Sequence, residues 1–85
     1  MEGILEFIRI NGSVRCYNRF RRFLQSNNGE LSDCGFSDFC NYDCVTKLVA
    51  KELKEILIYL SDKINKNRYR YSGVTNIDII NFLNK

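Results

Sequence analysis

Four cysteines are the side chains of this 85-residue chain whose type and number could build a metal site or a pair of disulfides. They are Cys16, Cys34, Cys40 and Cys44. Four thiolates would complete a structural zinc site, but no pair has the C-x2-C spacing typical of zinc ligands, so they are weak metal candidates. Disulfides need an oxidising compartment, for which the N-terminus offers no secretion signal. We expect reduced cysteines that pack as small hydrophobic residues, with no metal or other cofactor.

Groups that could carry out acid–base or nucleophilic catalysis are scarce. The chain has no histidine, which removes every Ser-His, Cys-His and His-metal arrangement. Asp33, Asp38 and Asp43 recur every five residues, a spacing that suits neither one helical face nor a calcium loop. The five glycines are scattered and form no phosphate-binding loop. We therefore expect a protein that is not an enzyme.

Two segments that mix arginine with tyrosine are the strongest candidates for a binding surface. Arginine can bind a carboxylate or a phosphate through two hydrogen bonds, and tyrosine can stack on bases or anchor a protein contact. The expected partner-binding residues are Arg15, Arg19, Arg21, Arg22, Arg68, Tyr69, Arg70 and Tyr71. The competing interpretation is that Phe20 and Phe23 belong to the core while the arginines form only a solvated face.

The net charge of +3 is distributed in blocks along the chain. Residues 9–22 carry five arginines and no acid, residues 30–44 carry four carboxylates and no base, and residues 63–71 carry four bases and no acid. This layout indicates an anionic partner, or complementary faces that meet within the fold or across a dimer. The positive net charge excludes a DNA mimic, because such a protein would be strongly acidic overall.

The clearest secondary-structure element is a long amphipathic helix from Cys44 to about Asn65. Asp43 is its expected N-cap, and we expect Glu52 and Glu55 to pair with lysines of the same helix. Residues 58–59 widen the apolar face, which favours contacts on two sides or a homodimer through this helix. The residues that recur at three- and four-residue steps, as one helical face requires, are Val45, Leu48, Val49, Leu53, Ile56, Leu57, Leu60 and Ile64.

The N-terminal third admits two interpretations. Residues 13–26 have the spacing of a helix, and residues 4–10 could form a short helix before it. Asn11-Gly12 between apolar segments is also a strong hairpin signal, so two strands that pair at this dipeptide are the alternative. We favour the two helices.

The rest of the chain contributes one loop and one further helix. Residues 30–43 are rich in Asp, Ser, Gly and Cys and predict a loop with one helical turn near 37–41. Thr75 and Asp78 resemble a capping box and predict a helix over 76–84, with its apolar stripe on Ile77, Ile80 and residues 82–83. The predicted fold is a single compact all-α domain over residues 1–85, with four or five helices; an α+β fold with an N-terminal hairpin is the runner-up.

The amino-acid composition indicates the location and the kind of source of the protein, but it does not identify a mechanism. No apolar run approaches the roughly 18 residues of a membrane span, so we expect no membrane partner and a cytoplasmic location. The chain has no proline and one alanine, against nine isoleucines and ten asparagines. Isoleucine and asparagine have AT-rich codons, whereas proline and alanine have GC-rich ones. The composition therefore indicates an AT-rich genome, such as that of a phage, a virus, a mobile element or a low-GC bacterium.

The expected function is that of a small non-enzymatic binding protein. Most simply, it would bind and block a larger host protein or complex through its Arg/Tyr-rich surfaces, as a viral or phage accessory protein in the host cytoplasm. The alternative is a small helical nucleic-acid-binding protein whose basic segments contact phosphates, with residues 13–26 as the recognition helix of a helix–turn–helix.

Overall fold

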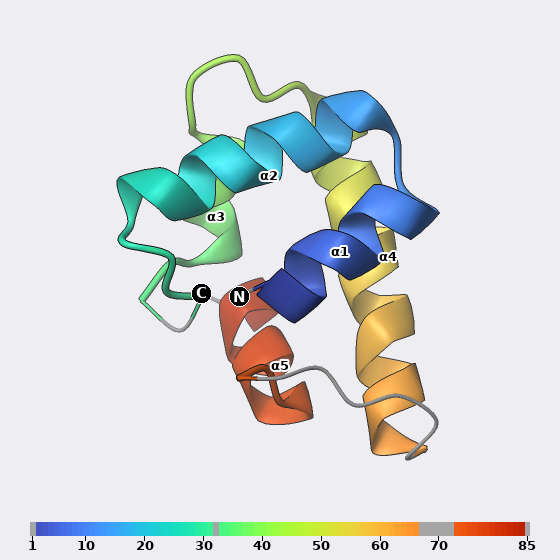
Figure 1. Ribbon diagram of the computed structural model, residues 1–85. Coiled ribbons are helices and arrows are strands. Elements are labelled where there is room, and N and C mark those ends of the chain that lie inside the picture. Colours follow the sequence, from blue (N-terminus) through green and yellow to red (C-terminus); the bar gives the residue numbers. More distant parts are fainter. Residues whose placement is uncertain (1, 32, 67–72, 85) are drawn as a thin grey trace.

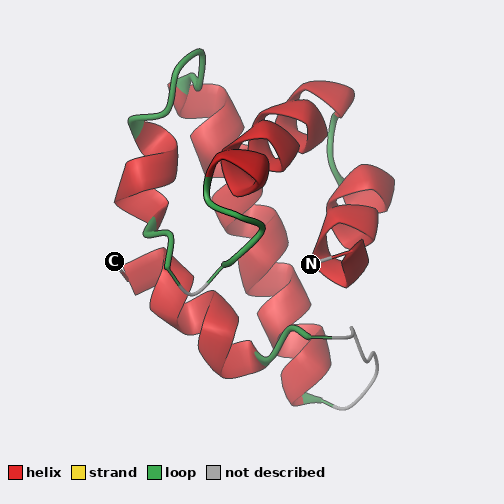
Figure 2. Ribbon diagram, turned by 60° about the vertical axis from the view of Figure 1, so that its left-hand side comes forward, coloured by secondary structure: helices red, strands yellow, loops and turns green. Residues whose placement is uncertain are grey.

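The computed structural model describes residues 2–31, 33–66 and 73–84, and these residues form five helices and no strand (Figures 1 and 2). The all-α fold is therefore confirmed, and the runner-up with an N-terminal β-hairpin is wrong. The helices are α1 (Glu2–Asn11), α2 (Val14–Ser26), α3 (Phe36–Cys40), α4 (Lys47–Asn65) and α5 (Asn76–Asn84).

The Asn11-Gly12 dipeptide ends a helix instead of turning a hairpin. The Gly12 amide donates to the carbonyl of Ile8 at 2.8 Å, and the Asn11 side chain donates to the carbonyl of Phe7. Ser13 then caps α2, because its hydroxyl accepts a hydrogen bond from the amide of Cys16 at 3.1 Å. These local bonds satisfy the backbone groups on both sides of the turn, so two helices follow each other with only two residues between them.

The central helix is α4, which packs against each of the other four helices (Figure 1). It begins at Lys47 with Thr46 as its N-cap, three residues later than the sequence predicted and with a different capping residue from Asp43. Cys44 has a φ of 68°, a left-handed conformation that ends any helical run there. Val45 still packs against the core from the loop that precedes the helix.

One hydrophobic core unites the helices, and all of its aromatic members come from α1, α2, α3 and α5. The Phe20 ring contacts Phe39 and Phe82 edge-on, with ring centroids 5.8 and 5.9 Å apart. The Phe23 ring meets the same two rings at 5.5 and 6.4 Å. The largest fully buried side chains are Phe20, Phe39, Phe82, Ile4, Ile8, Leu24, Leu31, Leu53, Leu57, Leu60, Ile79 and Cys16.

The last helix is capped as predicted, and its buried face agrees with the predicted apolar stripe at Phe82 but not at the two predicted isoleucines. The Thr75 amide donates to the Asp78 carboxylate and the Asp78 amide donates to the Thr75 hydroxyl, which is a reciprocal capping box. Ile79 and Phe82 are buried, whereas Ile77 and Ile80 are exposed. A hydrogen bond between the side chains of Ser61 and Asn76 ties α5 to α4. Among the described residues, no helix is both long and apolar enough to cross a bilayer.

Candidate functional site: the arginine face of α2

Helix α2 carries four of the predicted binding residues and no acidic residue. Arg15, Arg19 and Arg22 follow one another at steps of four and three residues, so they share one flank of the helix. Arg21 is turned from Arg22 by about 100° around the helix axis. The core-facing side is occupied by Cys16, Phe20, Phe23 and Leu24. The structure places all four predicted residues on this helix and divides them between two flanks; their role in binding stays a prediction.

Most of these guanidinium groups face solvent. Arg15, Arg21 and Arg22 are exposed and Arg19 is half-buried. None of the four makes an ion pair within the described part of the chain. The Nε atom of Arg19 is buried and finds no hydrogen-bond partner among the described residues, so none of these residues offsets the cost of taking this atom out of water.

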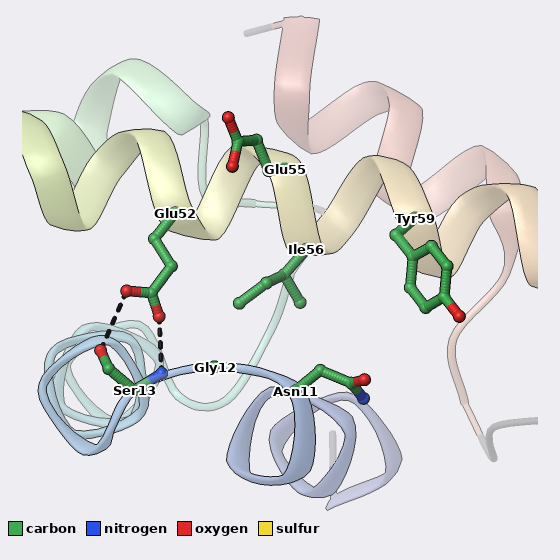
Figure 3. A pocket seen from close by; sticks show the side chains of 7 residues that line it. All are labelled: Asn11, Gly12, Ser13, Glu52, Glu55, Ile56 and Tyr59. Atoms are coloured by element: carbon green, nitrogen blue, oxygen red, sulfur yellow. Dashed lines mark hydrogen bonds between the residues drawn. The ribbon is translucent and has the colours of Figure 1, made fainter.

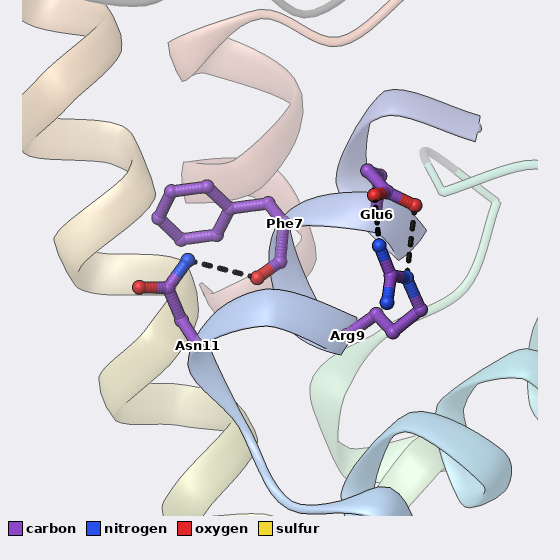
Figure 4. A network of polar contacts seen from close by, with 4 residues as sticks. All are labelled: Glu6, Phe7, Arg9 and Asn11. Atoms are coloured by element: carbon purple, nitrogen blue, oxygen red, sulfur yellow. Dashed lines mark hydrogen bonds and ion pairs between the residues drawn. The ribbon is translucent and has the colours of Figure 1, made fainter.

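Arg9, which belongs to the same basic block of the sequence, has a different role. It forms an ion pair and two hydrogen bonds with Glu6, one turn earlier on α1 (Figure 4). These bonds lower the pKa of Glu6 and raise that of Arg9. The charge of Arg9 is therefore paired with Glu6 on α1. The arginines of α2 are the remaining charges of the basic block of residues 9–22.

The arginine flank of α2 runs toward the loop that joins α3 to α4. Ser26, which continues the line of Arg15, Arg19 and Arg22, has its hydroxyl 3.2 Å from that of Tyr42. The Tyr42 ring in turn lies edge-on to Phe23, with centroids 5.5 Å apart. This hydroxyl pair and ring contact fix the C-terminal end of the flank against the loop.

The acidic segment does not neutralise these arginines. Glu30, Asp33, Asp38 and Asp43 are exposed, and none of them forms an ion pair with a described basic residue. Glu30 and Asp33 instead lie close enough that a hydrogen bond and the charge of Asp33 raise the pKa of Glu30. The two blocks of opposite charge therefore both remain available to solvent and to partners.

A groove lies between the first turns of α2 and α4, at the N-terminal end of the arginine flank. It has a volume of about 370 Å³ and is lined by Ser13, Arg15, Leu48, Val49 and Glu52. The Leu48 side chain is 79% exposed, although the periodicity of the sequence placed it in the core. An arginine and an exposed leucine thus meet at the same surface depression.

Glu52 joins α4 to the beginning of α2 (Figure 3). One carboxylate oxygen accepts from the Ser13 amide at 2.6 Å and the other accepts from the Ser13 hydroxyl at 3.0 Å. The expected pairing of Glu52 and Glu55 with lysines of their own helix is not among the ion pairs of the described residues. Glu55, one turn later, points away from the Ser13 turn in Figure 3. Glu52 therefore has a structural role that local sequence spacing did not reveal.

Replacement of Glu52 by alanine tests this role. Glu52→Ala leaves the N-terminal end of α2 without its charged acceptor, so we expect the free energy of unfolding to fall by about 1–2 kcal/mol. Glu55→Ala is the matched control on the same helix and should change it by less than about 0.5 kcal/mol. Urea unfolding followed by circular dichroism measures both. Equal losses for the two variants would contradict the capping role.

The four cysteines occupy different environments and none forms a disulfide. Cys16 and Cys34 are buried, Cys40 is half-buried and Cys44 is exposed. Burial raises the pKa of Cys16 to about 12, and the charge of Glu52 and a hydrogen bond to it add to the shift. The Cys34 thiol donates to the carbonyl of Glu30. Within the described ranges, no three cysteine or acidic side chains are grouped so that they could hold a metal ion.

These environments predict an order of alkylation. At pH 7.5 Cys44 should react with iodoacetamide well before Cys16, because the thiolate is the nucleophile and Cys16 is both buried and almost entirely protonated. We expect Cys44 to be modified first, Cys40 more slowly, and Cys16 and Cys34 only after urea is added. Timed quenching and peptide mass spectrometry measure the order. Early modification of Cys16 in the folded protein would contradict its placement.

Half of the predicted binding residues cannot be placed on this surface. Arg68, Tyr69, Arg70 and Tyr71 lie outside the described residues, so the prediction that they share a surface with α2 stays a prediction. No protein-family model matches the chain, no curated protein is similar to it in sequence, and no solved structure matches its fold.

Proposed function

We propose that this chain is a small non-enzymatic binding protein that attaches through α2 to an acidic surface of a larger protein and thereby blocks that surface. The observation that carries the proposal is the set of four arginines on α2, a 13-residue helix that has no acidic residue; three of them form the arginine flank. None of them is neutralised by an ion pair within the described residues.

The type of side chain also favours a protein contact. Arginine, with its planar fork, binds carboxylates through two bonds and loses less hydration than lysine, and it is enriched at the centres of protein interfaces. The lysines of α4 are interspersed with glutamates and an aspartate. Unlike α2, that helix therefore carries charges of both signs. The AT-rich composition supports an accessory protein of a virus, phage or mobile element that acts on a host component in the host cytoplasm.

The proposal is tested by affinity capture from the cells in which the protein acts. Tagged wild-type protein and the double variant Arg19→Glu with Arg22→Glu are used as bait in lysates treated with nuclease. We expect a protein that the wild type retains and the double variant loses, because charge reversal creates like-charge contacts that cost several kcal/mol. Circular dichroism of each bait verifies that the helices are intact.

The matched control is Lys51→Glu with Lys54→Glu, which changes the charge by the same amount at the same three-residue spacing on α4. Both lysines are exposed, and they are turned by about 100° or more from Glu52, which bonds to the Ser13 cap of α2. This control should retain the partner. If both double variants bind as the wild type does, the arginines of α2 form only a solvated face.

Nucleic-acid binding is the second candidate, and one feature of α2 favours it. Asn18 and Gln25 stand on the outward side between the arginines and are exposed. Arginine, asparagine and glutamine are the side chains that read guanine and adenine edges in the major groove. Affinity for a short DNA duplex that falls steeply between 50 and 200 mM salt, together with a protein that is captured only when the nuclease treatment is omitted, would favour this candidate over the first.

A further inference from the structure

We infer that the groove between the first turns of α2 and α4 seats an aliphatic side chain from an acidic amphipathic helix of the partner protein. The inference rests on the proposed function and extends it, because it names the type of partner side chain that binds at the N-terminal end of the arginine flank. The groove is lined by Ser13, Arg15, Leu48, Val49 and Glu52 and has a volume of about 370 Å³.

The walls of this groove are suited to an apolar group. Leu48, which lines the groove from α4, is 79% exposed. Val49, the second apolar lining residue, is buried and belongs to the hydrophobic core. An aliphatic side chain seated here would remove Leu48 from water and contact Val49, and burial of apolar area is favourable.

The groove's polar groups do not require a polar ligand at its centre. The Ser13 amide and hydroxyl both donate to Glu52, and the Ser13 hydroxyl also accepts from the Cys16 amide. The negative charge of Glu52 is therefore engaged with the start of α2. Arg15 is the remaining charged lining residue, and it has no ion-pair partner among the residues that the structure describes.

Charge complementarity identifies the rest of the occupant. From Arg15 the arginine flank continues through Arg19 to Arg22, over about 10 Å of helix rise. Carboxylates at three- and four-residue steps on a partner helix would have the same spacing, with an aliphatic residue beyond them at the groove. Helix-in-groove recognition uses anchors of this kind. A nucleic-acid backbone would match the arginines but has no aliphatic group for Leu48, so the groove favours a protein helix.

Selection from a peptide library tests the inference without knowledge of the natural partner. The probe is a phage-displayed library of random 16-residue peptides, selected on the full wild-type protein. We expect the enriched peptides to combine Asp or Glu with Leu, Ile or Phe at helical spacing. The most enriched peptide is then synthesised and its affinity measured by fluorescence anisotropy.

Leu48→Asn should weaken this peptide at least tenfold. Ile77→Asn is the control, since it removes an isoleucine that is 68% exposed on α5; it should change the affinity less than twofold. Both positions are exposed, and circular dichroism verifies that the variants are folded. Absence of enriched peptides, enrichment of peptides without aliphatic residues, or a peptide indifferent to Leu48→Asn would each overturn the inference.

The double variant Arg19→Glu with Arg22→Glu separates failure of the groove from failure of the proposed function. A peptide that requires these arginines but not Leu48 would overturn the groove and leave the arginine surface supported. A peptide that requires neither would count against both. Binding of a 12-base-pair DNA duplex that depends on the arginines, with no acidic peptide enriched, would assign the surface to nucleic acid and overturn the protein-helix occupant.

Discussion

Phe20→Ala is expected to lower the free energy of unfolding by about 3–5 kcal/mol. The Phe20 side chain is fully buried, and its ring contacts Phe39 of α3 and Phe82 of α5 edge-on. Alanine would leave a cavity where three helices meet and would remove both aromatic contacts. Since domains of this size are marginally stable, the variant should be largely unfolded at 37 °C. Thermal unfolding followed by circular dichroism measures the loss.

Phe20→Leu is the companion variant for this position. Leucine fills much of the space but cannot make the edge-to-face contacts, so we expect a smaller loss of about 1–2 kcal/mol. The difference in the free energy of unfolding between the two variants measures the cost of the cavity at the junction of α2, α3 and α5. Equal stability of Phe20→Ala and wild type would show that the aromatic cluster is placed wrongly.

Leu53→Ala should lower the free energy of unfolding by about 2–5 kcal/mol. Leu53 lies in the middle of α4 and has no exposed surface, so its truncation opens a cavity in the helix that touches all the others. Leu48→Ala is the matched control on the same helix: because Leu48 is 79% exposed, the expected change is below about 0.5 kcal/mol. A loss below about half a kcal/mol for Leu53→Ala would contradict the orientation of α4.

The helices could be predicted from sequence because their signals are local. The buried residues of α2 recur at three- and four-residue steps, and Ser13 stands where its cap is needed. The reciprocal bonds of Thr75 and Asp78 depend on residues only three positions apart. The hairpin signal at Asn11-Gly12 was misleading because Gly12 serves packing: a Cβ there would lie 2.7 Å from the Cδ1 atom of Ile56.

The orientation of the helices was less predictable, because apolar residues are abundant on several sides. Leu48 and Val49 are consecutive, so they point about 100° apart, and Val49 takes the core position. In α5 the isoleucines at 77, 79 and 80 offer an apolar residue in several directions, and of the three only Ile79 is buried in the core. Only tertiary packing decides between such neighbours.

The candidate site was predictable in its residues but not in its surroundings. Runs of arginine are visible in the sequence, whereas their lack of ion-pair partners among the described residues depends on where each acid lies. The bond between Glu52 and Ser13 joins residues 39 positions apart. The groove beside Arg15 depends on the same approach of α4 to α2, so no local pattern could have revealed it.

The most direct test of the arginine face as the binding surface compares two triple charge reversals against the captured partner. One variant replaces Arg15, Arg19 and Arg22 of α2 with glutamate, and the other replaces Lys47, Lys51 and Lys54 of α4. The two sets have the same four- and three-residue spacing, and both variants change the net charge by the same amount. We expect the arginine variant to lose at least a hundredfold in affinity by calorimetric titration and the lysine variant to change less than threefold. Equal losses would show that only overall charge matters, and unchanged affinity of the arginine variant would contradict the account.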